Sequence, residues 1–313
     1  MPRTARLKLQ DTDAWYHLCA RAAARHAEFP LADPLVRFKL FELIKHYAAI
    51  YFCNFASVNI MGNHWHGVCH FDKPRALSPE ELMERALALY PNSRKTLEAW
   101  PEKKWLRLQK RLFDVSELMR NVQGSFSRWY NRTYHRKGHF WGERFKSVIL
   151  GGPQAVLDAV LYVELNAVRA GLVQCPEDYQ GCSLYLREAG QDDWLMPLSE
   201  ILYDEQGTKD ELHARFKELV YFRGAVITKV GQKPIPEDVI QREAARGFRK
   251  RGAYAKKLRC FTDGLVLGSE LYVREHLLRL RNVGHYLRRK NPVSQLEGAL
   301  FSLREQRSHF AET

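Results

Sequence analysis

Two neighbouring apolar stretches with a short break between them constrain the fold of this chain most strongly. Residues 48–60 are rich in aromatic and β-branched side chains, and residues 64–71 alternate between polar and apolar types. Both patterns are typical of β-strands. The break between them, Met61-Gly62-Asn63, has the composition of a turn. The pattern therefore predicts a hairpin within an antiparallel sheet.

The rest of the N-terminal half supplies the other elements that such a sheet needs. Short β-rich runs and apolar residues at helical spacing predict strands at 15–21 and 147–150 and helices at 34–47, 77–88, 117–134 and 153–170. Ser78 and Pro79 are suited to begin a helix, and Gly171 is suited to end one. This order of elements predicts an α+β domain, an antiparallel sheet with helices on one face, that ends near residue 180.

The charge balance indicates a polyanionic partner. The chain of 313 residues has 49 Lys and Arg against 36 Asp and Glu, a net charge of +13 at pH 7. Nucleic acid is the first candidate partner and an anionic membrane the second. No apolar run approaches the roughly 18–20 residues of a spanning helix, and no apolar stretch follows the N-terminal residues, so we expect a cytoplasmic protein without a membrane span. The six cysteines form no C-x-x-C pair, so we expect reduced thiols.

Two histidines at the start of the second predicted strand form a candidate metal site. Strand side chains alternate between faces, so His64 and His66 point the same way while Trp65 points into the core. Two imidazoles side by side are suited to bind a divalent metal. The simpler interpretation is a pair of hydrogen-bonded or solvent-facing histidines. A zinc hydrolase would also use such a pair, with a third ligand such as His70 on the same face.

A tyrosine on the helix predicted at 153–170 is the candidate nucleophile. Asp158, Tyr162 and Asn166 are four residues apart and share one helix face. An ordinary surface tyrosine has the same pattern. Cleavage of DNA by a phenol needs assistance at neutral pH, because the pKa of tyrosine is about 10 and charge accumulates on the phosphate. The two histidines and the amide oxygen of Asn166 would make a ligand set suited to Mg²⁺ or Mn²⁺.

Cations alternate with aromatic rings in residues 128–146. Cations neutralise phosphates, and exposed rings stack on unpaired bases with a gain of about 1–3 kcal/mol per base. The alternative is that the rings belong to the core and the cations are solvated. The residues predicted to contact DNA are Arg128, Arg132, Arg136, Lys137, Trp141, Arg144 and Lys146, with Arg169 on the tyrosine helix.

Three stretches together resemble the HUH single-tyrosine transposases, in particular the REP-associated tyrosine transposases. They are residues 60–66 with the histidine pair, the aromatic and basic block 138–147, and residues 162–173 with the candidate tyrosine. Their joint order and spacing carry the resemblance, which covers residues 1 to about 185. Gly62 and Ala167 depart from the pattern, because the family usually has proline at both positions.

The resemblance implies a fold and a reaction. It implies a ferredoxin-like sheet with the two histidines on a central strand, Tyr162 as the nucleophile and Asn166 as a metal ligand borne by a helix. The implied substrate is single-stranded DNA near a small hairpin such as a palindromic repeat, cleaved through a 5′-phosphotyrosine intermediate. Asn63, Asp158 and His70 are candidates to support these groups. The protein would act as a monomer or a homodimer.

Residues 186–313 are expected to form a mostly helical, basic domain after a catalytic domain of residues 1–185. Basic runs occur at 246–259 and 279–290, and residues 259–273 resemble the tail of longer family members. This region is expected to bind DNA, and the alternative is a solvated helical appendage. Two rival functions for the whole chain remain: a catalytically inactive protein that binds hairpin DNA or RNA, and a zinc-dependent hydrolase.

Overall fold

The computed structural model describes residues 7–9, 11–23, 28–203, 206–226, 231–245, 264–282, 291–295 and 300–304, which are built around one seven-stranded sheet. In sheet order the strands are β2 (Cys53–Ile60), β3 (His64–Phe71), β1 (Ala14–Arg21), β4 (Lys146–Leu150), β5 (Gly264–Gly268), β7 (Leu300–Arg304) and β6 (Val293–Gln295). The first four strands pair antiparallel, and β5 joins β4 in parallel. The α+β class and the hairpin of β2 and β3 are confirmed.

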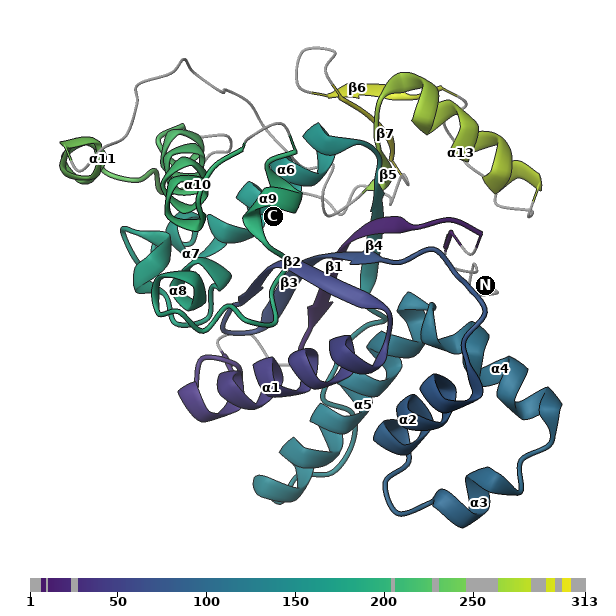
Figure 1. Cartoon of the computed structure of the whole chain (residues 1–313). Coiled ribbons are helices and arrows are strands. Elements are labelled where there is room, and N and C mark those ends of the chain that lie inside the picture. The colour runs from purple at the N-terminus through teal and green to yellow at the C-terminus, as the bar shows by residue number, and fades with distance from the viewer. Residues whose placement is uncertain are drawn as a thin grey trace.

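Helices cover both faces of the sheet rather than the one face expected (Figure 1). Helices α1 (Pro34–Ile50) and α5 (Val115–Thr133) pack in one core with the even-numbered residues of β1. Helix α6 (Pro153–Glu164) packs in a second core with Val68 and Val148 on the opposite face. The reason is visible in β2, where every residue except Asn54 is buried. Strands that are apolar on both faces require a layer on each side.

The boundary between α1 and β2 differs from the expectation. The strand predicted at 48–60 is wrong at its start, because α1 continues to Ile50 and β2 begins only at Cys53. Ile44 and Ala48 are buried at helical spacing along α1, so helix packing outweighs the strand preference of the residues after them. The strands predicted at 15–21, 64–71 and 147–150 agree with β1, β3 and β4.

The helices after β3 are partly predicted. Helix α2 (Pro79–Leu89) begins as expected, with the Ser78 side chain accepting a hydrogen bond from the backbone N–H of Glu81. Helices α3 (Arg94–Glu98) and α4 (Glu102–Leu112) have no predicted counterpart. Helix α3 is only five residues long and buries Leu97 alone, so it is too short to give a clear periodicity. Helix α4 buries Leu108 and Leu112 at helical spacing, so its signal is present in the sequence.

The second half of the chain both adds helices and extends the sheet. Its helices are α7 (Asn166–Arg169), the 3₁₀ turn Pro176–Asp178, α8 (Ser183–Glu188), α9 (Leu198–Ile201), α10 (Lys209–Gly224), α11 (Glu237–Ala245) and α13 (Glu270–Asn282). The expected helices are present, but strands β5, β7 and β6 were not anticipated. Helix α8 spans the predicted domain boundary at residues 185 and 186, and the division into two domains stays a prediction. The basic run 246–259 and residues 283–290 lie outside the described residues.

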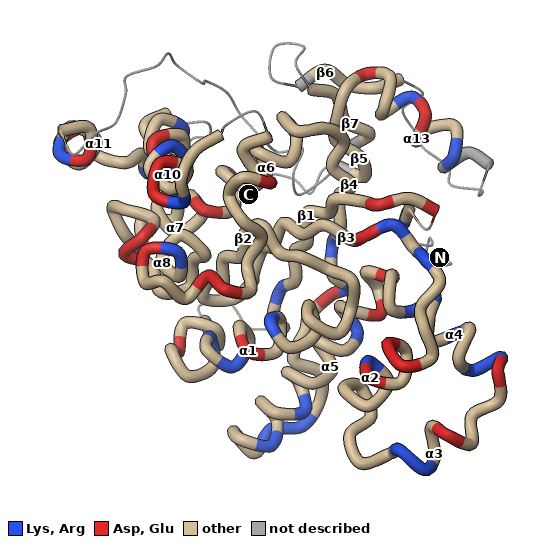
Figure 2. The backbone as a smooth tube through the Cα atoms, viewed as in Figure 1, with Lys and Arg blue, Asp and Glu red and all other residues tan. Residues whose placement is uncertain are grey.

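No helix within the described ranges combines the length and apolar composition that a membrane crossing requires. Charged residues are spread over the helices, and several Lys and Arg residues lie near the end of α5 (Figure 2).

An aromatic cluster joins α5 to the segment before β4, and its centre is the best place to test the fold. Phe126 is fully buried, with its ring centroid 4.9 Å from that of Phe140 and 5.5 Å from that of Trp141. We expect Phe126→Ala to lower the free energy of unfolding by about 3–5 kcal/mol, because it leaves a cavity among rings. Leu106→Ala on α4, where the side chain is 53 % exposed, should change it by less than about 0.5 kcal/mol. Urea unfolding followed by tryptophan fluorescence measures both, and equal losses would contradict the packing described.

Candidate functional site

Four rings from three elements meet on the α6 face of the sheet. The imidazole centroids of His64 and His66 on β3 are 5.0 Å apart, and that of His17 on β1 is 5.1 Å from His66. The ring of Tyr162 on α6 stands edge-on to two of them, with centroid distances of 5.7 Å to His66 and 5.8 Å to His17. The structure therefore brings the predicted tyrosine to the predicted histidines within a single chain.

Hydrogen bonds orient both predicted metal ligands. The Nδ1 atom of His64 is 2.8 Å from Oδ1 of Asn63, and Nδ1 of His66 is 3.0 Å from Nε2 of His17. A histidine that binds a metal through one ring nitrogen commonly donates the N–H of its other nitrogen to a neighbour in this way. Asn63 thus contacts the residue that it was predicted to support.

Burial keeps the two imidazoles neutral. It lowers the pKa of His64 to about 4, with a smaller contribution from the positive charge of Arg21. Burial also lowers the pKa of His66 well below its ordinary value, and the neighbouring His17, His64 and Lys146 act in the same direction. A neutral imidazole has a free lone pair on one nitrogen, which is the form that binds a metal.

The residues present fit a divalent ion at two positions and leave a third to an oxygen ligand. Within the described ranges no three side chains of His, Cys, Asp or Glu are arranged to hold a metal. An amide or a substrate oxygen would therefore have to complete the set. Asn166 is the predicted amide, and its Nδ2 donates to the carbonyl oxygens of Tyr162 at 2.9 Å and Val163 at 3.4 Å. Its Oδ1 is left as the atom that suits a hard cation.

A buried arginine lies beside the tyrosine. The guanidinium carbon of Arg169 on α7 is 5.9 Å from the ring centroid of Tyr162, and the side chain is only 8 % exposed. Burial and the nearby charge of Arg223 lower the pKa of Arg169 to about 10, so it stays protonated at pH 7. No acceptor in the part of the chain that the structure describes binds its buried Nη2 atom. A buried cation without a counter-charge is costly, so this position favours an anionic ligand.

Buried polar contacts fix the end of α6 against the sheet. The carboxylate of Glu164 is fully buried and accepts hydrogen bonds from the Ser57 hydroxyl at 2.8 Å and the Ser183 hydroxyl at 2.5 Å. The side chain of Asn59 on β2 donates to the carbonyl of Val163 at 2.8 Å. These contacts hold the helix turn that contains Tyr162 in register with the histidines.

Two residues predicted to support the site have other partners. Asp158 forms a buried ion pair with Arg223 of α10 at 2.5 Å and accepts a hydrogen bond from Gln154. His70 lies near the other end of β3, where its Nε2 is 3.3 Å from Asp13 and its ring is 5.0 Å from Trp15. Asp158 therefore joins α6 to α10, and the contacts of His70 do not include the other imidazoles.

The predicted DNA contacts separate into exposed and packed residues. The exposed ones are Arg128, Arg132, Arg136, Lys137 and Arg144. Lys146 is half-buried on the histidine face and close enough to His66 to lower its pKa. Trp141 packs on Phe126, and its indole N–H donates to the carbonyl of Gln123 at 3.0 Å, which favours the core interpretation for this ring.

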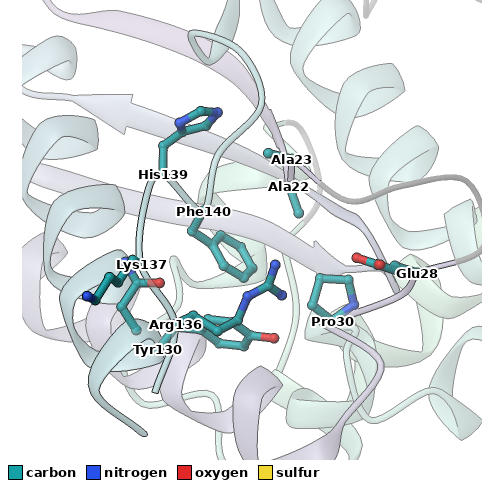
Figure 3. Close-up of a pocket in the computed structure, with 10 residues that line it drawn as sticks. Ala22, Ala23, Glu28, Pro30, Tyr130, Arg136, Lys137, His139 and Phe140 are labelled. Atoms are coloured by element: carbon teal, nitrogen blue, oxygen red, sulfur yellow. The ribbon is translucent and has the colours of Figure 1, made fainter. Parts of the chain in front are cut away.

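A shallow pocket opens beside the end of β1 (Figure 3). Arg136, Lys137 and His139 line it together with the ring of Tyr130 and the carboxylate of Glu28. Ala22, which lines the pocket, directly follows the last residue of β1, and its N–H donates to the carbonyl of Asn63. The pocket therefore adjoins the segment that leads into the histidine pair.

The structure adds three residues that the sequence analysis does not single out: His17, Arg21 and Arg223. Period-two alternation places His17 and Arg21 on the same face of β1, so a signal exists in the sequence. That signal does not say which face of β1 adjoins the histidines, because strand pairing decides it. Arg223 lies in a helix distant in sequence from Asp158 and carries no local signal.

Comparison with known proteins finds only a weak structural similarity. No family model and no curated protein matches it. One solved structure with similarity to it is described as "Structure of the REP associates tyrosine transposase bound to a REP hairpin". That structure is 13 % identical in sequence, covers 67 % of this chain and 93 % of its own, and has a TM-score of 0.41. This degree of similarity does not assign the chain to the family.

The ion pair of Asp158 and Arg223 gives a test of how α6 is held. Both side chains are 3 % exposed, so Asp158→Ala should leave an unpaired buried guanidinium and lower the free energy of unfolding by about 3–5 kcal/mol. The double variant Asp158→Leu with Arg223→Leu should lose clearly less, because it removes both charges. Chemical denaturation of the three proteins measures this difference. A double variant as unstable as the single one would contradict the assignment of the ion pair.

Proposed function

We propose that this chain cleaves and rejoins single-stranded DNA, with Tyr162 as the nucleophile and a divalent cation held by His64 and His66. One observation carries the proposal: the ring of Tyr162 lies 5.7 Å from the imidazole of His66 in the same chain. An ordinary surface tyrosine does not pack against a buried, neutral imidazole. A zinc hydrolase that uses His70 as third ligand is less well supported, because His70 contacts Asp13 and Trp15 instead.

The reaction follows from the groups around the phenol. The Tyr162 phenol gives up its proton to water as its oxygen attacks the phosphorus of a phosphodiester and forms a 5′-phosphotyrosine bond, while the bond to the 3′ oxygen breaks and that oxygen takes up a proton from water. The new ester keeps the reactivity of the old one, so a second 3′-hydroxyl can reverse the attack and regenerate the phenol. No external energy source is needed for either step.

A bound Mg²⁺ or Mn²⁺ would neutralise charge on the phosphate oxygens during attack. Nε2 of His64, Nε2 of His66 and Oδ1 of Asn166 are the atoms that would hold it. The guanidinium of Arg169 offers a second positive charge to the same phosphate, because it is buried, protonated and adjacent to the Tyr162 ring. Such pre-placed charges are a principal source of rate enhancement in phosphoryl transfer.

The proposed substrate is DNA with a small hairpin, as the sequence resemblance implies. Exposed cations run from Arg128 on α5 to Arg136 and Lys137 in the turn beyond it, and the last two line the pocket beside the histidine segment. These residues would neutralise phosphates that flank the cleaved position. One chain supplies both the histidines and the tyrosine, so a monomer would suffice for cleavage.

The first experiment asks for the covalent intermediate. Labelled hairpin DNA with a single-stranded flank, incubated with the protein and Mg²⁺ or Mn²⁺, should give an adduct stable in denaturing gels. We expect Tyr162→Phe to abolish it, because no oxygen remains to attack, and His66→Ala to reduce it at least about 100-fold. Tyr203→Phe, at a tyrosine that is 44 % exposed, is the matched control and should behave as wild type.

The outcomes of this experiment are distinct. An adduct that persists in Tyr162→Phe would show that the nucleophile is misassigned. Tight hairpin binding by the wild type with no adduct under either metal would support the catalytically inactive binding protein instead.

A second experiment concerns the cations at the pocket. Arg136→Ala combined with Lys137→Ala should weaken hairpin binding and lower the slope of log K against log salt by about 1.4, since each phosphate contact to single-stranded DNA contributes about 0.7. Lys95→Ala with Lys103→Ala removes the same charge from exposed positions on α3 and α4 and should leave the slope unchanged. Fluorescence anisotropy at several salt concentrations measures it, and equal slopes for the two double variants would exclude a specific role of the pocket.

A further inference from the structure

We infer that His17 is a positioning residue that keeps the lone pair of His66 on Nε2, the atom that would bind a metal, and also supports the ring of Tyr162. The role of His17 in metal binding rests on the proposed function. Its effect on the tautomer of His66 rests on the hydrogen bond between the two imidazoles. None of the sequence motifs contains His17, which lies on a different strand from the histidine pair.

The position of His17 follows from strand pairing. In the register of β1 against β3, Cys19 lies opposite His66 and His17 lies opposite Val68, so His17 is the diagonal neighbour of His66 on one face. Both side chains are nearly fully buried, with 1 % and 3 % exposed. Their ring planes differ by 12°, and Nε2 of His17 is 3.0 Å from Nδ1 of His66.

A hydrogen bond between two neutral imidazoles requires one nitrogen to donate and the other to accept. If Nδ1 of His66 donates, the lone pair of His66 is on Nε2, and His17 must accept through Nε2 and carry its own proton on Nδ1. This is the one arrangement in which His66 can bind a metal through Nε2. Without an acceptor at residue 17, both tautomers of His66 become available and the metal-binding form is no longer favoured.

A second contact gives His17 another role that can be separated from the first. Its ring meets the Tyr162 ring edge-on, with a centroid distance of 5.8 Å and an interplanar angle of 82°. Tyr162 makes the same type of contact with His66 at 86°. The two imidazoles therefore form one wall against which the phenol ring packs, and an apolar side chain at residue 17 would preserve part of this wall.

Two substitutions distinguish the hydrogen bond from the packing. His17→Leu keeps an apolar side chain of similar size and removes the acceptor. His17→Gln places an amide oxygen near the position of Nε2 and keeps an acceptor. His276→Leu is the matched control, because His276 is a histidine with 3 % exposure on α13 whose Nδ1 bonds to the carbonyl of Tyr272.

Three measurements on the full chain test the inference without relying on activity. Long-range ¹H–¹⁵N NMR of histidine-labelled, metal-free protein reports the tautomer of His66. Calorimetric titration with Mn²⁺ alone reports metal affinity, and thermal unfolding reports whether each variant folds. We expect His17→Leu to weaken Mn²⁺ binding about 10–100-fold and to mix the His66 tautomers. His17→Gln should stay within about 3-fold of wild type, and His276→Leu should match wild type.

Each alternative result is decisive. A folded His17→Leu variant with wild-type Mn²⁺ affinity and an unchanged His66 tautomer overturns the inference, and so does a wild type that binds no Mn²⁺. If His17→Leu does not fold, the Gln variant decides: retained affinity supports the inference, and a loss as large as that of His66→Ala overturns it. Loss of Mn²⁺ affinity in His17→Leu, with no DNA adduct in wild type, would support the role of His17 and refute the proposed function.

Discussion

The antiparallel pairing of β1 with β3 determines where the groups that the strands contribute to the candidate site lie. Its register puts Arg21 opposite His64 and Cys19 opposite His66, so one face of two strands gathers three imidazoles and a cation. A shift by one residue would turn the odd-numbered side chains of β1 to the α1 and α5 face and exchange His17 for Leu18. The register is strongly specified because the α1 and α5 face of both strands is fully buried, and the site depends on that requirement.

The site buries polar and charged groups whose desolvation lowers the stability of the fold, and a bound ligand would offset this cost. Burial keeps His64 and His66 neutral, and it leaves the Arg169 guanidinium protonated with an unsatisfied nitrogen. Buried polar groups of this kind lower stability unless they are paired. A divalent cation would use the imidazole lone pairs and a phosphate would use the guanidinium, so the two ligands compensate different groups. Binding of both would therefore be more favourable than the sum of separate sites, since they also attract each other.

Local patterns in the sequence are sufficient to predict the strands β1, β3 and β4, the cap of α2 and the face shared by His64 and His66. They also predict that Tyr162 and Asn166 lie one turn apart. What they cannot supply is pairing between distant elements. The sequence around His17 gives no local signal for its contact with His66. The sequence also makes Asp158 a candidate for the site, whereas in the structure its carboxylate forms an ion pair with Arg223 of α10. Helix α3 is not predicted because its five residues are too few for a periodic pattern, whereas α4 carries such a pattern and is missed nonetheless.

The second half of the chain is structurally continuous with the first. Strand β5 hydrogen-bonds to β4, whose first residue is Lys146 of the site. Gly151 packs so closely against Tyr272 of α13 that an added Cβ would clash with its ring. Helix α10 supplies Arg223 to Asp158 on the tyrosine helix. Without these elements β4 would become an open edge and α6 would keep a buried carboxylate without its partner. The second half therefore supports the strand and the helix that carry the site.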